Sequence, residues 1–227
     1  MQIRSLGATS NGNCHYVAMN GTEFLLDAGL AFAAIQKGIG FRTHSMAGVL
    51  LTHAHVDHSK AIKDMLKAGI EVYASRGTLN QLGINHYRAH IVKAGEWFTM
   101  GGLRVLPIET VHDTAEPLGF VIDGEGERLL YLTDSLYNKY DIHGITHMIV
   151  ECNHSLDILR ESDVNESLKH RIMKNHMSLE TVEKMIESMD KSRLQHVYLT
   201  HLSDKHSDEA MFRERIQRLT GVEVDVF

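Results

Sequence analysis

The stretch LTHAHVDHSKA, residues 51–61, places His53, His55, Asp57 and His58 within six positions, directly after an apolar run. In an extended segment residues i and i+2 point the same way, so His53 and His55 can reach one metal ion together. Asp57 and His58 stand where the chain turns into a helix, and they can bind a neighbouring ion. No folding role requires three imidazoles at this point. The stretch therefore predicts a metal site on a strand-to-helix loop.

The available ligand types favour zinc. Neutral imidazoles and carboxylates suit Zn²⁺ and also tolerate Mn²⁺ or Fe²⁺. The chain has sixteen histidines but only two cysteines, Cys14 and Cys152. Two cysteines are too few for a disulfide framework, and a set of ligands poor in thiolates disfavours a structural zinc site of the cysteine type.

The length of 227 residues predicts a single domain over residues 1–227. The first residues contain no apolar segment of signal-peptide length, and no stretch approaches the roughly 20 apolar residues that span a bilayer. We therefore expect a cytoplasmic protein without a membrane partner. The formal net charge of −6 argues against non-specific wrapping of nucleic acid, although a local basic patch can still bind phosphates.

Apolar runs of strand and helix length predict an α/β chain. Two strand-like runs, 14–19 and 23–28, flank Asn20-Gly21, a dipeptide that favours a two-residue hairpin turn. A buried strand at 47–52 precedes a helix at 59–69, with Ser59 as its expected cap. Further strands are expected at 71–75, 96–100, 103–109, 119–123, 128–133, 146–152 and 196–200, and further helices at 165–174, 178–190 and 207–219.

Polar residues stand at the ends of several of these strands: His112, Asp134, Glu151 and His201. Loops that leave the same edge of a sheet converge, so ligands far apart in the sequence can surround one ion. The two oxygens of Asp134 allow it to bridge two ions. A lone strand-end histidine is more often solvated or capped, and it is the run at 53–58 that indicates metal binding. Asp27, which ends LLDAG, is either a turn former or a group that orients a ligand.

Together these motifs resemble those of the metallo-β-lactamase fold. HAHVDH, the isolated His112, Asp134 in LTDS, His201 in LTHLS and Asp27 in LLDAG occur in the expected order over nearly the whole chain. The resemblance implies a four-layered αββα sandwich and a two-metal centre. It further implies that one ion is held by His53, His55 and His112, and the other by Asp57, His58 and His201, with Asp134 bridging.

Two further segments resemble the nucleic-acid phosphodiesterase branch of that superfamily. ECNHSLDIL (151–159) and LKHRIMKNHMSLE (168–180) are similar to motifs of ribonuclease Z, ribonuclease J and, most of all, small bacterial and phage exonucleases. In that branch an acidic residue orients a histidine that protonates the leaving oxygen, and the matching residues are Glu151 and His176. With Asp57 of the run at 53–58, the expected catalytic residues are Asp57, Glu151 and His176.

The chain lacks the inserted domain of ribonuclease J and the protruding arm of ribonuclease Z. A compact enzyme of this kind has to bind nucleic acid through local charge. The best basic group is Arg160, Lys169, His170, Arg171 and Lys174, for which the alternative is an ordinary solvated helix face. His154 has no assigned role.

The sequence thus predicts a two-metal phosphodiesterase, a DNA or RNA nuclease, in which a metal-bridging hydroxide attacks phosphorus. Glu151 and His176 serve the leaving group, because an alkoxide departs poorly unless it is protonated. The alternative enzyme is a carboxyl-ester, lactone or thioester hydrolase on the same dinuclear scaffold, which has no need of that pair. In a third, non-catalytic interpretation the metals are a structural staple in a binding module. Zinc or manganese, DNA or RNA, exo- or endonuclease action, and the oligomeric state stay open.

Overall fold

A computed structural model describes all 227 residues, which form two compact units. The first unit comprises residues 1–109 and 114–127, and the second comprises residues 110–113 and 128–227. None of the helices is both long and apolar enough to cross a membrane.

The first unit is built on a six-stranded sheet with the order β1-β2-β3-β4-β5-β6. Its strands are β1 (Gln2–Thr9), β2 (Gly12–Met19), β3 (Thr22–Leu26), β4 (Met46–Leu50), β5 (Val72–Ala74) and β6 (Ala89–Ile91). Strands β1 to β3 pair antiparallel, and β3 to β6 pair parallel. Three more strands form an antiparallel meander: β7 (Phe98–Met100), β8 (Leu103–Glu109) and β9 (Leu118–Asp123).

The hairpin expected around Asn20-Gly21 joins β2 to β3. Met19 pairs with Thr22, so the turn contains two residues, and both have positive φ, 49° for Asn20 and 77° for Gly21. Positive φ at both central positions is the geometry that matches the twist of a hairpin, and asparagine and glycine adopt it most readily.

Helices of the first unit are α1 (Phe32–Gly38), α2 (Val56–Ser59), α3 (Ile62–Lys67) and α4 (Arg76–Gln81), with a 3₁₀ turn at Thr43–Ser45. Apolar side chains of α1 and α3 pack on the sheet in one core, which includes Ile35, Ile62, Met65 and Val49. The single helix expected at 59–69 is wrong. Two shorter helices occur instead. Ser59 is the last residue of α2, where its hydroxyl donates to the carbonyl oxygens of Ala54 and His55, and α3 begins at Ile62 without a side-chain cap hydrogen bond.

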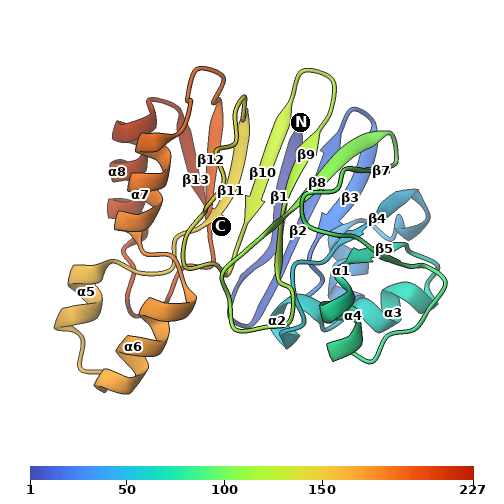
Figure 1. Ribbon diagram of the computed structural model, residues 1–227, viewed down its shortest axis with the longest axis horizontal. Coiled ribbons are helices and arrows are strands. Elements are labelled where there is room, and N and C mark those ends of the chain that lie inside the picture. Colours follow the sequence, from blue (N-terminus) through green and yellow to red (C-terminus); the bar gives the residue numbers. More distant parts are fainter. The chain divides into compact units, whose positions relative to one another are not determined.

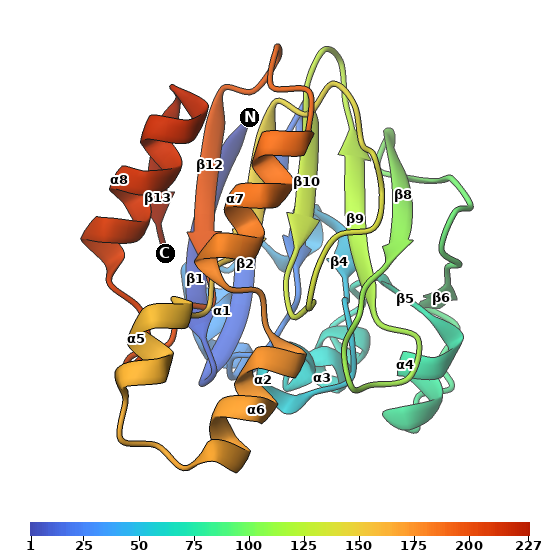
Figure 2. The ribbon, with the colours of Figure 1, turned by 60° about the vertical axis from the view of Figure 1, so that its left-hand side comes forward.

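The second unit contains four parallel strands, β10 (Arg128–Leu132), β11 (His147–Glu151), β12 (His196–Thr200) and β13 (Glu223–Val226). Helices α7 (Leu179–Ser188) and α8 (Glu209–Thr220) lie beside these strands in Figures 1 and 2. Figure 2 shows α5 (Leu156–Glu161) and α6 (Glu166–Asn175) beyond the carboxyl ends of the strands. Parallel strands bring their carboxyl ends to one edge, so side chains that follow them gather there.

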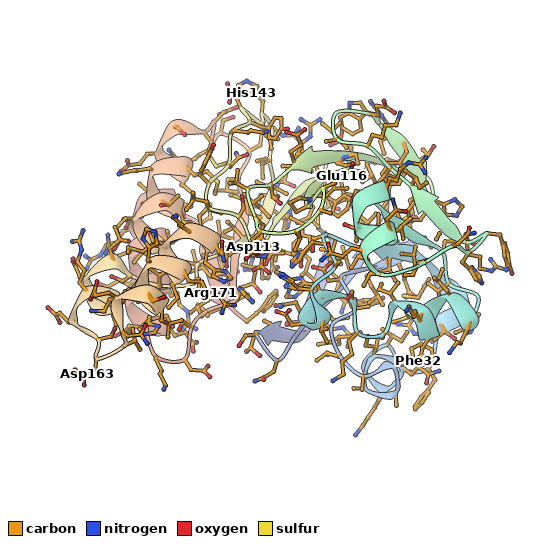
Figure 3. The ribbon with its side chains drawn as sticks, turned by 60° about the horizontal axis from the view of Figure 1, so that its bottom comes forward. Phe32, Asp113, Glu116, His143, Asp163 and Arg171 are labelled. Carbon is orange, nitrogen blue, oxygen red and sulfur yellow. The ribbon has the colours of Figure 1, made fainter.

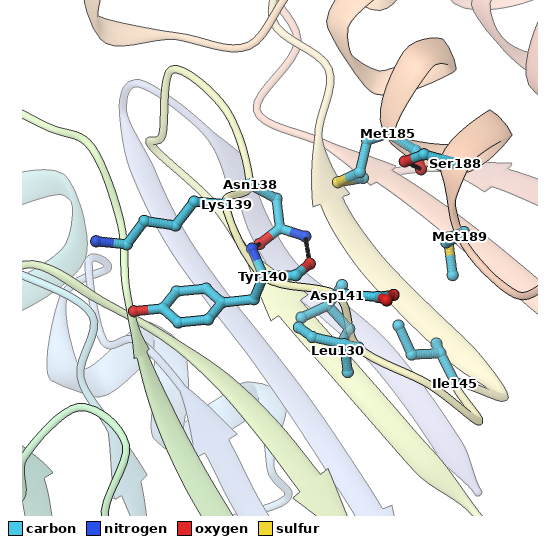
Figure 4. Close-up of a pocket in the computed structure, with 10 residues that line it drawn as sticks. Leu130, Asn138, Lys139, Tyr140, Asp141, Ile145, Met185, Ser188 and Met189 are labelled. Atoms are coloured by element: carbon cyan, nitrogen blue, oxygen red, sulfur yellow. Dashed lines mark hydrogen bonds between the residues drawn. The ribbon is translucent and has the colours of Figure 1, made fainter.

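Helix α7 buries Leu179, Val182 and Ile186, which recur at the spacing of one helix face. Met185 of α7 and Met189, the residue after the helix, line a cavity of about 360 Å³ (Figure 4). Asn138, Asp141 and Leu130 are also in its wall. None of the predicted site residues lines this cavity.

We predict that the protein unfolds in one cooperative step, as expected for the single domain proposed from the sequence. The chain passes between the units after residues 109, 113 and 127, so neither unit is one continuous segment that folds in isolation. Differential scanning calorimetry should give one transition whose calorimetric and van't Hoff enthalpies agree. Two resolved transitions would show that the units are separate domains.

Candidate functional site

In the first unit, a buried carboxylate organises the histidine-rich loop. Leu26 at the end of β3 pairs in parallel with Leu50 at the end of β4, so Asp27 and Thr52 lie at the same edge of the sheet. The backbone N–H of Thr52 donates to Asp27 Oδ1 at 2.8 Å, and the Thr52 hydroxyl donates to the same carboxylate at 2.9 Å. Asp27 is fully buried and has φ of 58°, an uncommon conformation for a residue with a side chain.

Asp27 also fixes the orientation of His58. The Nδ1 atom of His58 lies 2.8 Å from Asp27 Oδ2, and both side chains are inaccessible to solvent. A carboxylate accepts a hydrogen bond, so Nδ1 carries the proton and Nε2 keeps its lone pair. His53 is oriented similarly: its Nδ1 lies 3.0 Å from the Thr52 hydroxyl oxygen, whose own hydrogen is directed at Asp27. Both rings thereby present Nε2 as a metal-binding atom.

The other predicted ligands of the loop lie close to these two. The ring centroids of His53 and His55 are 4.8 Å apart, and those of His53 and His58 are 4.2 Å apart. Asp57 Oδ2 lies 3.5 Å from His58 Nε2. The side-chain amide of Asn13 donates to the same Nε2 at 3.0 Å, which agrees with a lone pair on that nitrogen.

Glycine at position 29 allows the loop to lie against the segment that follows β3. Ala28 donates its N–H to the carbonyl oxygen of His58 at 2.8 Å, and Ala61 donates back to Ala28 at 2.9 Å. A Cβ atom at Gly29 would lie 1.6 Å from the backbone oxygen of Asp57, which is an impossible contact. The close approach of the Gly29 backbone to the Asp57 backbone therefore requires glycine at position 29. This contact fixes the backbone that carries Asp57 and His58.

In the second unit, polar residues at or just after the carboxyl ends of β10, β11 and β12 meet at one edge of the parallel strands. Leu132 is in register with Val150, and Glu151 is in register with Thr200, so Asp134, Glu151 and His201 become neighbours. Asp134 has φ of 48° and His201 has φ of 58°. Non-glycine residues in this conformation are strained and concentrate at functional sites.

Glu151 is the buried centre of this cluster. Its two oxygens accept from His176 Nδ1 at 2.6 Å, His201 Nδ1 at 3.0 Å, and the backbone N–H groups of Ser135 and Met177, each at 3.2 Å. Burial works against the charged form of Glu151, but His176 and His201 outweigh it and hold the pKa of the carboxyl below its usual value. Glu151 is therefore a carboxylate.

His176 follows directly after α6 and is the partly exposed member of the cluster. Burial opposes its charge, but the carboxylates of Glu151 and Asp134 together raise the pKa of the imidazole to about 10. A pKa in that range keeps the ring protonated at neutral pH. The arrangement therefore holds an imidazolium ion at the accessible side of a buried carboxylate.

Asp134 and His201 complete a group that could hold a metal ion. His201 Nδ1 lies 3.0 Å from Asp134 Oδ1, and the ligand atoms of Asp134, Glu151, His176 and His201 all lie within 4.8 Å of one another. His112 stands beside them, with Nε2 3.9 Å from Asp134 Oδ2. Its Nδ1 donates to the backbone oxygen of Asn175 at 3.2 Å, which leaves Nε2 as the metal-binding nitrogen.

The structure therefore gathers the predicted residues into one group in each unit. The first unit groups His53, His55, Asp57 and His58, and the second groups His112, Asp134, Glu151, His176 and His201. Sequence reasoning missed Asn13, Thr52 and Asn175, which contact predicted ligands. Of these, only Thr52 carries a recognisable signal, since LT also precedes Asp134 and His201.

The basic group named from the sequence and His154 also belong to the second unit. In the basic group, Arg160 is on α5 and pairs with Asp157, whereas the other members are on α6. His154 is buried, and its backbone oxygen accepts from Leu179 N–H at 2.8 Å. Burial lowers the pKa of His154 to about 4, so its ring is neutral at physiological pH.

Comparisons with known proteins identify the family of the chain. Residues 22–202 match the sequence family described as the β-lactamase superfamily domain. The exodeoxyribonuclease YycJ of Bacillus anthracis is 28% identical, over 94% of this chain and 87% of the relative. The exodeoxyribonuclease WalJ of Streptococcus pneumoniae is 27% identical, over 97% of this chain and 90% of the relative.

Solved structures share the fold at lower identity. The metallo-β-lactamase fold protein YhfI of Bacillus subtilis has a TM-score of 0.76 at 16% identity, covering 99% of this chain and 95% of that protein. The short form of human tRNase Z has a TM-score of 0.67 at 15% identity, covering 100% and 96%. These similarities confirm the predicted fold class, a metallo-β-lactamase fold of mixed α/β type.

The role of Asp27 leads to a prediction about metal affinity. Replacing it by asparagine keeps its shape but removes the charge that fixes the tautomer of His58, so Asp27→Asn should bind zinc about 10- to 100-fold more weakly. Competition titration against a chromophoric chelator measures the affinity. The matched control is Asp64→Asn, at an exposed residue of α3, which should bind zinc as the unmodified protein does. Equal zinc affinity in all three proteins would show that Asp27 does not support a metal ligand.

Proposed function

The chain belongs to the β-lactamase superfamily, and on this premise we propose that it is a metal-dependent phosphodiesterase that cleaves DNA. Relatives named exodeoxyribonucleases align with nearly the whole chain, and they support DNA as the substrate. The similarity to the ribonuclease TTHA0252 of Thermus thermophilus covers 63% of this chain and 39% of the relative, and it supports the same class of reaction.

The donors of the two units fit divalent metal ions. Asp27 and Thr52 in the first unit, and Asn175 in the second, set histidine tautomers in which Nε2 is the metal-binding nitrogen. We propose that two ions are held by seven residues, His53, His55, His112, Asp57, His58, His201 and the bridging Asp134. Imidazole and carboxylate donors fit Zn²⁺ best and tolerate Mn²⁺. When bound, such ions make water nucleophilic at neutral pH and neutralise charge on phosphoryl oxygens.

The pairing of Glu151 with His176 is the observation that carries the phosphodiesterase proposal. The 2.6 Å contact between His176 Nδ1 and Glu151 fixes the orientation of the imidazole, while the ring keeps some exposure to the surface. An ester or lactone hydrolase on the same metal scaffold has no need of such a group. A phosphodiester needs it, because an alkoxide leaves phosphorus poorly without a proton.

In the proposed reaction, His176 transfers a proton to the leaving oxygen in the step that breaks the phosphodiester bond. His176 keeps its Nδ1 proton in the hydrogen bond to Glu151 and donates its Nε2 proton to the departing oxygen. The bond from phosphorus to that oxygen breaks as the oxygen of water bonds to phosphorus on the opposite side, and this water releases one proton to the solvent. His176 becomes neutral, and the carboxylate of Glu151 favours its return to the charged form by taking a proton from solvent.

Two ions per chain is the prediction for the metal centre. After reconstitution with Zn²⁺ and removal of excess metal, elemental analysis should give close to two ions. Asp134→Ala should retain fewer ions and lose turnover, because Asp134 is the one ligand assigned to both of them. Asp141→Ala, at an exposed aspartate, is the matched control and should keep both ions. One ion or none in the unmodified protein would contradict the ligand assignment.

The general acid predicts a contrast between two substrates. His176→Ala should lose on the order of 10² to 10⁴ in kcat on DNA, the usual contribution of a general acid. On a nitrophenyl phosphodiester the same variant should lose far less, because the phenolate leaves without a proton. Glu151→Gln should follow the same pattern less severely.

Metal content and a surface histidine serve as controls for this contrast. His143→Ala, at an exposed histidine, should match the unmodified enzyme on both substrates. Equal losses on DNA and on the nitrophenyl diester in His176→Ala, or a loss explained by missing metal, would remove the general-acid role and favour an ester or lactone hydrolase.

A further inference from the structure

Helix α6 contributes nothing to the hydrophobic core. None of its ten residues is buried, whereas α5, α7 and α8 each bury at least one apolar side chain. Leu168 and Met173 of α6 are among the exposed large hydrophobic residues of the chain. A helix of this length is marginally stable in water without packing. Its position therefore depends on contacts at its ends and on one half-buried face, formed by Lys169, Ile172 and Asn175.

Hydrogen bonds hold both ends of α6. At the start, the Asn165 side chain accepts from Leu168 N–H at 2.8 Å, and Lys169 Nζ donates to the backbone oxygen of Arg160 at 2.9 Å. At the end, Asn175 donates through its side chain to Asp113 at 3.1 Å and accepts through its backbone oxygen from His112 at 3.2 Å. The next residue is His176. The carboxyl end of α6 is thus bound to the proposed ligand His112 and joined directly to the proposed general acid.

The cationic side chains of α6 differ in whether they are neutralised. Lys169 pairs with Glu166 at 3.3 Å. Arg171 and Lys174 are exposed and make no ion pair or hydrogen bond within the structure. On α8, by contrast, Arg213, Arg215 and Arg218 all pair with glutamates. The half of α6 nearest to His176 therefore carries unneutralised positive charge.

Helical spacing places these two charges beside the anchored end. Arg171 is four residues before Asn175, and Lys174 is three residues after Arg171, so the three side chains lie on adjoining positions of one helix face. Figure 3 shows Arg171 on this segment, with Asp163 at the far tip of the loop before α6. The acidic residues of the segment thus precede the helix or stand in its first turn, away from His176.

We propose that Arg171 and Lys174 of α6 bind phosphates of the DNA strand next to the bond that is cleaved. This inference rests on the proposed function and specifies how the substrate is held. Exposed guanidinium and ammonium groups without internal partners are suited to phosphate oxygens, and the contact is independent of base sequence. Because α6 leads directly into His176, a strand held on this face lies next to the proton donor. On the same face, Asn175 anchors the end of α6 through its bonds to Asp113 and His112.

The test compares a double variant with a matched control. Arg171→Gln/Lys174→Gln removes both charges, and glutamine preserves helix propensity. Lys184→Gln/Arg218→Gln removes one lysine and one arginine from exposed positions on α7 and α8. Binding of a fluorescent single-stranded phosphorothioate DNA to the metal-loaded proteins is measured by anisotropy at several salt concentrations, so that no cleavage is required. Circular dichroism verifies that both variants are folded.

The double variant should bind on the order of tenfold more weakly at 0.1 M salt than the unmodified protein. The slope of log affinity against log salt should decrease by about 1.4, which is roughly 0.7 for each phosphate of a single strand that the variant no longer neutralises. The ratio of kcat/KM on DNA to kcat/KM on a nitrophenyl phosphodiester should also fall. The control variant should bind with the affinity and slope of the unmodified protein.

Affinity and slope unchanged in Arg171→Gln/Lys174→Gln would overturn the inference, as would equal losses in both variants. Failure of the proposed function gives a different result. In that case the unmodified protein cleaves neither DNA nor the nitrophenyl diester, whatever its affinity for the phosphorothioate strand.

Discussion

A carboxylate that is removed from water must be compensated by hydrogen bonds, and this constraint organises both units. Glu151 is fully buried and accepts from two imidazoles and two backbone N–H groups. Asp27, equally buried, accepts from Thr52 and His58. An unpaired carboxylate in either place would cost several kcal/mol, so the surrounding histidines have one favourable orientation. The orientation of the reactive side chains is therefore a consequence of burying these two acids.

The parts of the fold and site that could be predicted from the sequence are those set by local pattern. Apolar runs located β8 and β12 at their observed bounds, and Asn20-Gly21 located the hairpin, because burial and turn geometry act over a few residues. The motifs at 53–58, 112, 134 and 201 predicted the metallo-β-lactamase fold and a metal-dependent hydrolase of nuclease type. The comparisons confirm both predictions. The assignment of individual ligands and of Glu151 and His176 as catalytic residues stays a prediction.

Two of the missed residues are identified only by contacts between distant segments. Asn13 approaches His58 across 45 positions, and Asn175 accepts from His112 across 63 positions, yet neither residue type nor spacing distinguishes them. Helix α6 was expected from its pattern, but its lack of buried residues was not, because a basic amphipathic segment has the same pattern whether it packs or stays exposed. The break between α2 and α3 falls at Lys60 and Ala61, where no glycine or proline marks it in the sequence.

The central claim is that His176, oriented by Glu151, donates a proton and that neither residue binds a metal ion, although their ligand atoms lie within 4.8 Å of those of Asp134 and His201. Anomalous diffraction from crystals loaded with Zn²⁺ tests this claim directly. We predict two peaks for each chain, one bonded to His53, His55 and His112 and the other to Asp57, His58 and His201, with Asp134 contacting both. A peak within bonding distance of His176 or Glu151 would contradict the account, because a histidine bound to metal cannot serve as the general acid.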